Sequence, residues 1–212
     1  MEATTLLTRE RVSLESRDSD QPHIVGYGAV FYREGEAGTE YDVFGDGSLI
    51  ERVMAGAFDR AIREDDVRSF FNHDPNLILG RRRPGAESNT LELSVDERGL
   101  LYRVSPPPTR QDVLEAVARG DIDGSSFMFV PQRVTWIEEE DLWIRQIEEV
   151  ALWEVGPVAF PAYEATTSEL RQKYADRVRA EWEAVRSQRR NGSRAALRRR
   201  VNCRLRLIEI TE

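Results

Sequence analysis

The chain has 212 residues, 40% of them hydrophobic and 32% charged, which is enough apolar material for a buried core and excludes wholesale disorder. The longest apolar stretch, Gly156 to Tyr163, is too short to span a membrane, and residues 1–15 do not read as a secretory signal. A single cysteine, Cys203, excludes an internal disulfide framework and a cysteine-rich zinc site, as is typical of a reducing, cytoplasmic compartment.

The net charge of −8 is unevenly distributed along the chain. Residues 169–212 hold 13 of the 30 basic and 6 of the 38 acidic residues, a net charge of +7, so residues 1–168 carry −15. The acidic body argues against a specific nucleic-acid partner, and we expect no membrane partner. The arginine-rich tail remains free to bind an acidic partner or the body itself.

The first two-thirds of the chain favours strands with a few short helices. Alternating or β-branched stretches predict strands at residues 6–14, 23–32, 67–71, 77–79, 90–95, 100–104, 125–136 and 142–160. We expect bulges at Gly26 and Gly28, a hairpin joining residues 90–95 to 100–104, and a break in the last strand near Gly156-Pro157.

Two short helices and one long helix are also expected. One or two helical turns are predicted at residues 56–64, and a second short helix begins with a capping box from Thr109 to Asp112 and ends at Gly120. Apolar residues at helical spacing then predict an amphipathic helix over residues 168–190, and their stripe consists of Leu170, Tyr174, Val178, Trp182 and Val185.

Together these elements predict an α+β protein that is mostly β, built as a barrel or a sandwich. Residues 1–167 are expected to form one domain, followed by the amphipathic helix and arginine-rich tail of residues 168–212. The tail ends in an alternating stretch at residues 204–210.

Familiar cofactor motifs are absent from the sequence. Gly26-Tyr27-Gly28 lacks the third glycine and the helix of a dinucleotide site, and no phosphate-binding GxxxxGK[ST] loop occurs. Two isolated histidines without a cysteine pair make a zinc site improbable, although an all-carboxylate Mg²⁺ or Ca²⁺ site stays open. We therefore expect no cofactor and no bound metal.

Three residues have the right setting for acid–base or nucleophilic chemistry. His73 follows an apolar strand at the mouth of a turn, where it is either a structural turn histidine or an accessible base. Ser126 follows the glycine-flanked turn Gly120–Gly124 at the start of a strand, where it is either a turn hydroxyl or a nucleophile, with Ser125 as its competitor.

Glu154 is the third candidate, because it is the one carboxylate in the apolar run of residues 150–155. A carboxylate in such a strand needs a partner, since an unpaired buried charge costs several kcal/mol, on the order of 3–5. The partner is either one of the arginines or an imidazole that Glu154 would orient. His73, Ser126 and Glu154 together would supply a base, a nucleophile and an orienting acid.

The sequence resembles the caudoviral prohead serine protease family, the capsid-maturation proteases of tailed phages, over residues 23–170. The matching segments are GYGAVF (26–31), ERVMAGAFDRAI (51–62), NHDPNLILG (72–80), GLLYRVSPP (99–107), GDIDGSSFMFVP (120–131) and VALWEVGPVAFPAYEAT (150–166). The resemblance implies a closed β-barrel with short flanking helices, like that of the herpesvirus maturational protease. It also implies that His73, Ser126 and Glu154 are the catalytic residues.

Two positions depart from the family pattern. Met128 stands where the family has a glycine, and could crowd the backbone near Ser126, while Gly156 replaces a serine whose hydroxyl could support Glu154. Neither departure removes one of the three candidate catalytic residues. The resemblance therefore still implies an active serine endopeptidase.

The activity implied by the resemblance is cleavage during prohead maturation. The expected substrates are the scaffold segment of the major capsid protein and the protease itself, inside the procapsid in the host bacterial cytoplasm, and the protease is expected to be a homo-oligomer. The alternative is a catalytically inactive assembly scaffold or chaperone of the same fold. For the tail, the alternatives are an amphipathic helix that packs on the body or forms a coiled coil, and an encapsulation or self-processing segment.

Overall fold

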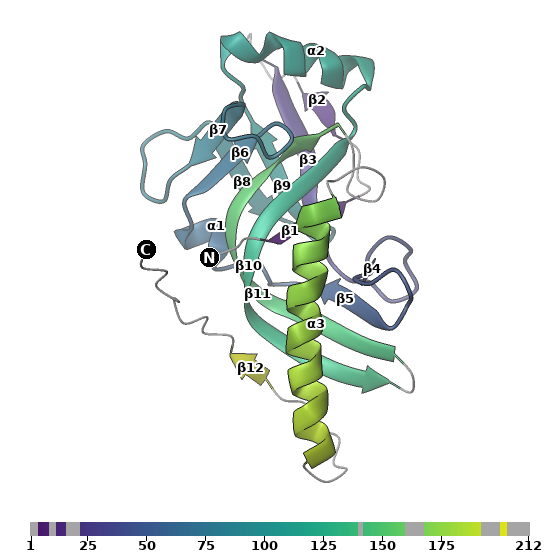
Figure 1. The fold of residues 1–212 in the computed structure, drawn as a ribbon. Helices are drawn as coiled ribbons and strands as arrows, with labels where there is room; N and C mark the ends of the chain where they lie inside the picture. The colour runs from purple at the N-terminus through teal and green to yellow at the C-terminus, as the bar shows by residue number, and fades with distance from the viewer. Residues whose placement is uncertain are drawn as a thin grey trace, which may run out of the picture.

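A computed structural model of the chain describes residues 4–8, 12–15, 22–139, 142–159, 168–191 and 200–202. These residues form two β-sheets, short helices beside them and one long helix near the C-terminus (Figure 1). The strands are β1 (Thr4–Thr8), β2 (Ser13–Glu15), β3 (His23–Val30), β4 (Tyr41–Asp42), β5 (Leu49–Val53), β6 (Val67–Phe70), β7 (Ile78–Arg82), β8 (Leu91–Val95), β9 (Gly99–Val104), β10 (Gly124–Glu139), β11 (Leu142–Val158) and β12 (Arg200–Asn202). The helices are α1 (Ala61–Glu64), the 3₁₀ turn η1 (Pro108–Arg110), α2 (Gln111–Arg119) and α3 (Ser168–Asn191).

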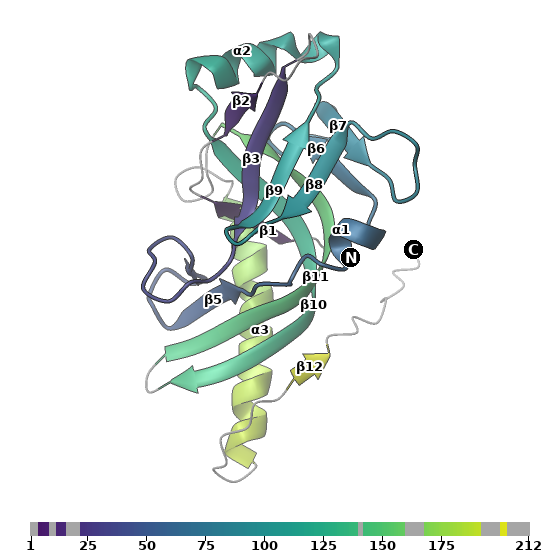
Figure 2. The ribbon, with the colours of Figure 1, turned by 180° about the vertical axis from the view of Figure 1, so that it is seen from behind.

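The long antiparallel hairpin of β10 and β11 organises the larger sheet. Its strand order is β1-β10-β11-β5-β4, with β12 also pairing with β10, β6 with β11, and β7 with β6. The hairpin is long enough for each end to have its own neighbours. Strands β1 and β6 pair with its open end, whereas β5 pairs with the end near the hairpin turn (Figures 1 and 2).

The smaller sheet, in the order β2-β3-β9-β8, packs its apolar residues against the open end of the hairpin. Leu100 and Tyr102 of β9 and Phe127 and Phe129 of β10 are fully buried in this shared core. The rings of Phe127 and Phe129 stack with centroids 4.9 Å apart. Burying each such side chain contributes about 1.5–3 kcal/mol, so this layer holds the open end of the hairpin rigid.

The expected closed β-barrel is wrong. Neither sheet closes on itself, and in the described residues the two sheets meet through isolated backbone hydrogen bonds, such as Thr90 N to Arg81 O (3.2 Å) and Val12 N to Asp123 O (3.0 Å). A barrel wall needs a continuous ladder between its edge strands, and single bonds do not make one. The fold is α+β and mostly β, with a few short helices, as expected.

Several local predictions are confirmed. Strands β8 and β9 form the expected hairpin, and Gly120 ends α2 in the left-handed conformation with φ 80°. The pairing of β3 with β9 shifts between Tyr27 and Ala29, which places a bulge at Gly28. A glycine is needed there because an added Cβ would lie 2.4 Å from a methyl carbon of Val155.

Other local predictions are wrong. The capping box at Thr109 does not form, because the 3₁₀ turn η1 takes up residues 108–110 and the cap of α2, Arg110, makes no side-chain hydrogen bond. The break near Gly156-Pro157 is absent, since β11 continues through both residues to Val158. The alternating stretch at residues 204–210 lies outside the described residues.

Helix α3 crosses the turn half of the hairpin on one face of the sheet, as Figures 1 and 2 show. Four residues of the expected apolar stripe, Tyr174, Val178, Trp182 and Val185, pack on the sheet in a second apolar cluster, and Val178 is fully buried. Among the described residues, no helix has the length and apolar character needed to cross a membrane.

Candidate active site

His73 lies in a tight turn between β6 and β7, at the open end of the hairpin. Asn72 and His73 have φ values of 53° and 59°, and in the described chain they are the non-glycine residues in the left-handed region. Asparagine and histidine are among the residues that tolerate this conformation best. Two consecutive left-handed residues reverse the chain sharply and turn the imidazole back toward the sheet.

Asn72 ties this turn to the end of β11. Its backbone N–H donates to Pro157 O (3.1 Å), and its side-chain Oδ1 accepts from the N–H of Ala159 (2.8 Å). The turn that carries His73 is therefore anchored on the strand that carries Glu154. Such strained backbone persists only where surrounding contacts hold it, and these two hydrogen bonds are such contacts.

Ser125 and Ser126 are the second and third residues of β10 and point in different directions. Both are fully buried. The Ser125 hydroxyl is hydrogen-bonded to the hydroxyl of Tyr102 (3.1 Å), on the core side of the strand. The Ser126 hydroxyl instead lies 2.8 Å from Nε2 of His73. Of the two competing serines, Ser126 is thus the one that the structure brings to the histidine.

Glu154 reaches the same side of the sheet through a β-bulge. Phe129 pairs with Leu152 and Met128 with Glu154, so Trp153 is an extra residue in β11. The sequence pattern places Glu154 on the face of Leu152, whereas the bulge turns it to the face of Met128 and Ser126. The bulge also frees the N–H of Leu152, which donates to Oδ2 of Asp65 (2.7 Å).

The three expected residues meet at this point. Oε2 of Glu154 is hydrogen-bonded to Nδ1 of His73, and Nε2 of the same ring contacts Ser126 Oγ. With the ring proton on Nδ1, the imidazole donates to the carboxylate and accepts from the serine hydroxyl. Of the two partners considered for Glu154, an arginine and an imidazole, the structure pairs it with the imidazole.

The surroundings of this cluster are largely dry. Ser126 is fully buried, and the side chains of Glu154 and His73 are 3% and 13% exposed. Electrostatic interactions are stronger where water is excluded. Burial, with a contribution from the charge of Glu154, raises the pKa of Tyr102, so this neighbouring phenol stays neutral at physiological pH.

The two departures from the family pattern have clear structural settings. Met128 is partly exposed and pairs with Glu154 across the strands. Gly156 pairs with Ser126 and has no room for a side chain, because an added Cβ would lie 2.3 Å from the carbonyl oxygen of Phe70. In this chain, therefore, close backbone packing requires glycine beside Ser126.

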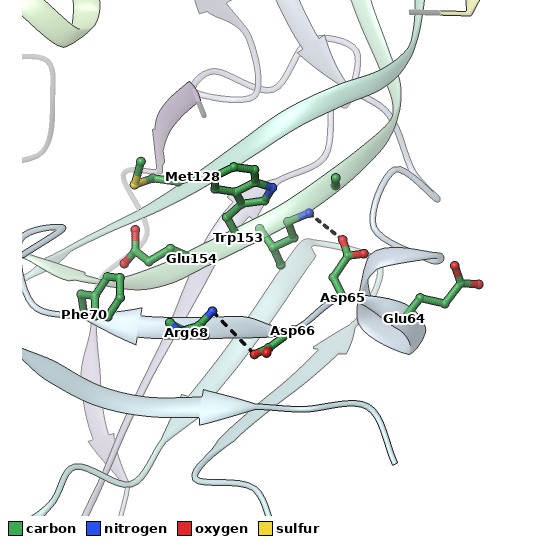
Figure 3. A pocket seen from close by; sticks show the side chains of 10 residues that line it. Glu64, Asp65, Asp66, Arg68, Phe70, Met128, Trp153 and Glu154 are labelled. Carbon is green, nitrogen blue, oxygen red and sulfur yellow. Dashed lines mark hydrogen bonds and ion pairs between the residues drawn. The ribbon is translucent and has the colours of Figure 1, made fainter. Parts of the chain in front are cut away.

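A pocket of about 480 Å³ adjoins Glu154 (Figure 3). Phe70, Met128 and Trp153 line it near Glu154, and Trp153 is 38% exposed. Farther along lie the side chains of Glu64, Asp65 and Asp66, and Arg68, whose strand position pairs with Glu154, lies between them and Phe70. Asp66 is paired with Arg81, which lowers the pKa of the Asp66 carboxyl. The pocket therefore has an apolar end beside the cluster and a charged end away from it.

Sequence reasoning identified the three residues but not what positions them. The bulge at Trp153 cannot be predicted from the pattern of hydrophobic residues in the sequence. The anchoring by Asn72 was equally hidden, although an asparagine directly before a turn histidine is a weak signal for left-handed backbone.

In the described residues, no group of three or more histidine, cysteine or carboxylate side chains is arranged to hold a metal ion.

Comparison with known proteins gives one clear match. No curated protein and no solved structure matches the chain. The model of a family described as caudovirus prohead serine protease matches residues 10–181, which include His73, Ser126 and Glu154. Since the match spans most of the 212 residues, the chain belongs to the caudovirus prohead serine protease family.

Proposed function

We propose that this protein is a serine endopeptidase with Ser126 as nucleophile, His73 as general base and Glu154 as the acid that orients the imidazole. Family membership implies a serine peptidase of capsid maturation. The observation that supports the residue assignment best is the continuous hydrogen-bonded series Glu154–His73–Ser126. Its members come from three separate elements, and its roles match those of a catalytic triad.

The proposed reaction is acyl transfer. Ser126 Oγ attacks the peptide carbonyl as its proton passes to His73 Nε2, and Glu154 stabilises the imidazolium that forms. Collapse of the tetrahedral intermediate breaks the C–N bond, and the imidazolium returns the proton to the leaving amine. Water then hydrolyses the acyl-enzyme with His73 again as base. Since Ser126 is fully buried, a neighbouring segment has to yield before the substrate carbonyl reaches it.

The proposed substrates follow from the family. A prohead protease acts on capsid proteins within the procapsid, and we assign to this chain the scaffold segment of the major capsid protein and the protease itself. The pocket beside Glu154 supports a peptide substrate, because Met128 and Trp153 offer an apolar surface for one of its side chains. The tail helix α3 packs on the body, which supports a structural role for that segment.

The first test uses covalent labelling and capsid processing together. The full-length protein is treated with a fluorophosphonate, and it is also co-expressed with the major capsid protein of its phage. We expect the label on Ser126 and a shortened capsid protein. Ser126→Ala should abolish the label and reduce cleavage by about 10³-fold or more, because a triad acts as a unit.

Ser125→Ala is the matched control for this experiment. It removes a neighbouring hydroxyl that faces Tyr102, so labelling and processing should persist. If Ser125→Ala alone abolished cleavage, Ser125 would be assigned as the nucleophile in place of Ser126. If wild type were neither labelled nor able to shorten the capsid protein, the assembly-scaffold alternative would replace the protease.

A further inference from the structure

Two buried oxygen atoms beside the candidate active site lack a hydrogen-bond partner in the described part of the chain. They are Oγ of Ser69, on β6, and Oε1 of Glu154, the carboxylate oxygen that does not face His73. Ser69 is fully buried and Glu154 nearly so. A buried polar atom without a partner costs about 1–3 kcal/mol, so two such atoms in one place call for an explanation.

Both atoms lie close to the position that a Cβ of Gly156 would occupy. The position that a Cβ of Gly156 would occupy lies 3.0 Å from Ser69 Oγ and 3.3 Å from Glu154 Oε1. A hydroxyl can donate, and a carboxylate oxygen can only accept, so the two groups are complementary. The carbonyl oxygen of Phe70 is nearest to that position (2.3 Å), so the two side-chain oxygens lie beside the same close backbone contact.

From this arrangement we infer that Ser69 is a positioning residue, whose hydroxyl donates to Oε1 of Glu154 directly or through one bridging water. With this bond, Glu154 is held at both oxygens, by the imidazole at Oε2 and by the hydroxyl at Oε1. A carboxylate held at both ends cannot rotate away from the ring. Ser69 thereby fixes the orientation of His73 without touching the substrate.

Besides Ser69, several charged and titratable groups face Glu154. His73 faces it from the turn, Arg68 from the paired position on β6, where it also contacts Asp66, and Tyr102 from the core side. A donor to the charged carboxylate favours its ionised form. Without that donor the carboxylate loses a contact that stabilises its charged form.

The inference rests on the proposed function for its meaning, but it can be tested without activity. Protein labelled with ¹⁵N-histidine has two imidazoles, and His23, which contacts Ser105, serves as an internal reference. His73→Gln assigns the His73 signal. In Ser69→Ala we expect the titration midpoint of His73 to rise by about half a pH unit, as loss of one hydrogen bond would give, while that of His23 stays in place.

The rate of fluorophosphonate labelling of Ser126 should fall about tenfold in Ser69→Ala, with the acidic limb of its pH profile moved to higher pH. Ser69→Thr, which keeps the hydroxyl, should restore both readouts, and Ser69→Cys, a weaker donor of similar size, replaces it if the extra methyl prevents folding. Ser125→Ala is the matched control, because it also removes a buried hydroxyl but should leave the His73 midpoint unchanged.

A folded Ser69→Ala protein with an unchanged His73 midpoint and pH profile would overturn the inference and leave the proposed function intact. A shifted midpoint in a protein whose Ser126 never reacts, in wild type or variant, would keep the positioning role and overturn the proposed function. The two failures are therefore distinguishable.

Discussion

The two ends of the β10–β11 hairpin each bury a carboxylate, and they use it differently. Near the hairpin turn, Glu51 of β5 is fully buried against Arg145 of β11, and the hydroxyl of Tyr174 also contacts it. Arg145 in turn binds Glu181 of α3 (2.9 Å). At the open end, Glu154 has His73 as its partner.

The difference lies in whether the partner can give up its charge. The Arg145 guanidinium stays charged at any physiological pH, so the cluster near the turn is a fixed link between α3 and the sheet. An imidazole can accept or donate a proton through its ring nitrogens, so the cluster at the open end is a candidate for proton transfer. One sheet thus contains a structural ion cluster and a candidate proton relay.

Among the changes that compare the two ends of the hairpin, the largest effect is expected from Glu154. Glu154→Gln keeps the shape of the side chain but removes its charge and permits the wrong imidazole tautomer. We expect the rate of acylation of Ser126 to fall about 10⁴-fold, as for loss of the acidic member of a triad. The rate at which a fluorophosphonate labels Ser126 measures this decrease.

The control for Glu154→Gln is its free energy of unfolding. Because the variant removes a buried charge, its free energy of unfolding should change by no more than about 1 kcal/mol, or increase. A folded variant that reacts within tenfold of wild type would show that the open-end cluster is structural, like the one near the turn.

The next largest effect is expected near the hairpin turn, from Arg145→Met. The change leaves Glu51 buried without its cation, so the free energy of unfolding should fall by about 3–5 kcal/mol. Urea unfolding followed by tryptophan fluorescence measures it, since Trp136 and Trp143 lie in the apolar cluster under α3 and the Arg145 guanidinium lies 5.7 Å from the centroid of the Trp136 ring.

The double variant with Glu51→Gln sharpens this result. It removes the unpaired charge and should recover part of the lost stability, a non-additivity that a double-mutant cycle quantifies. Labelling of Ser126 in the folded fraction should be unaffected. A loss of labelling without unfolding would mean that the two ends of the hairpin are coupled.

The smallest effect is a pH dependence. Burial, which outweighs the attraction of Arg145, raises the pKa of Glu51 above its ordinary value of 4.5. The folded state therefore binds a proton at pH values where the unfolded chain has released it, and the free energy of unfolding decreases as the pH rises from 4.5 to the raised pKa.

Glu51→Gln should lack this decrease. Each unit by which the pKa is raised corresponds to about 1.4 kcal/mol, so wild type should lose stability relative to the variant across that window and run parallel to it above. Urea unfolding between pH 4 and pH 8 measures the difference. Parallel curves throughout would mean that Glu51 keeps its ordinary pKa.

Local patterns predicted much of the secondary structure of this protein. The β8–β9 hairpin, the left-handed Gly120 and helix α3 follow from alternation, glycine and helical spacing, which are properties of neighbouring residues. The barrel was wrong because closure depends on whether distant edge strands form a ladder, and no local pattern records that. The predicted capping box was wrong because a 3₁₀ turn that begins at Pro108 takes its place.

The chain composition and its motifs determined by themselves which side chains are available for chemistry: two histidines, two adjacent serines and a carboxylate in an apolar strand. Only the tertiary structure decided that Ser126, rather than Ser125, meets the imidazole, and that Glu154 turns away from the core. The physical reason is that one extra residue in a strand reverses the face of every side chain beyond it. Pairing between strands far apart in the chain decides where that residue goes.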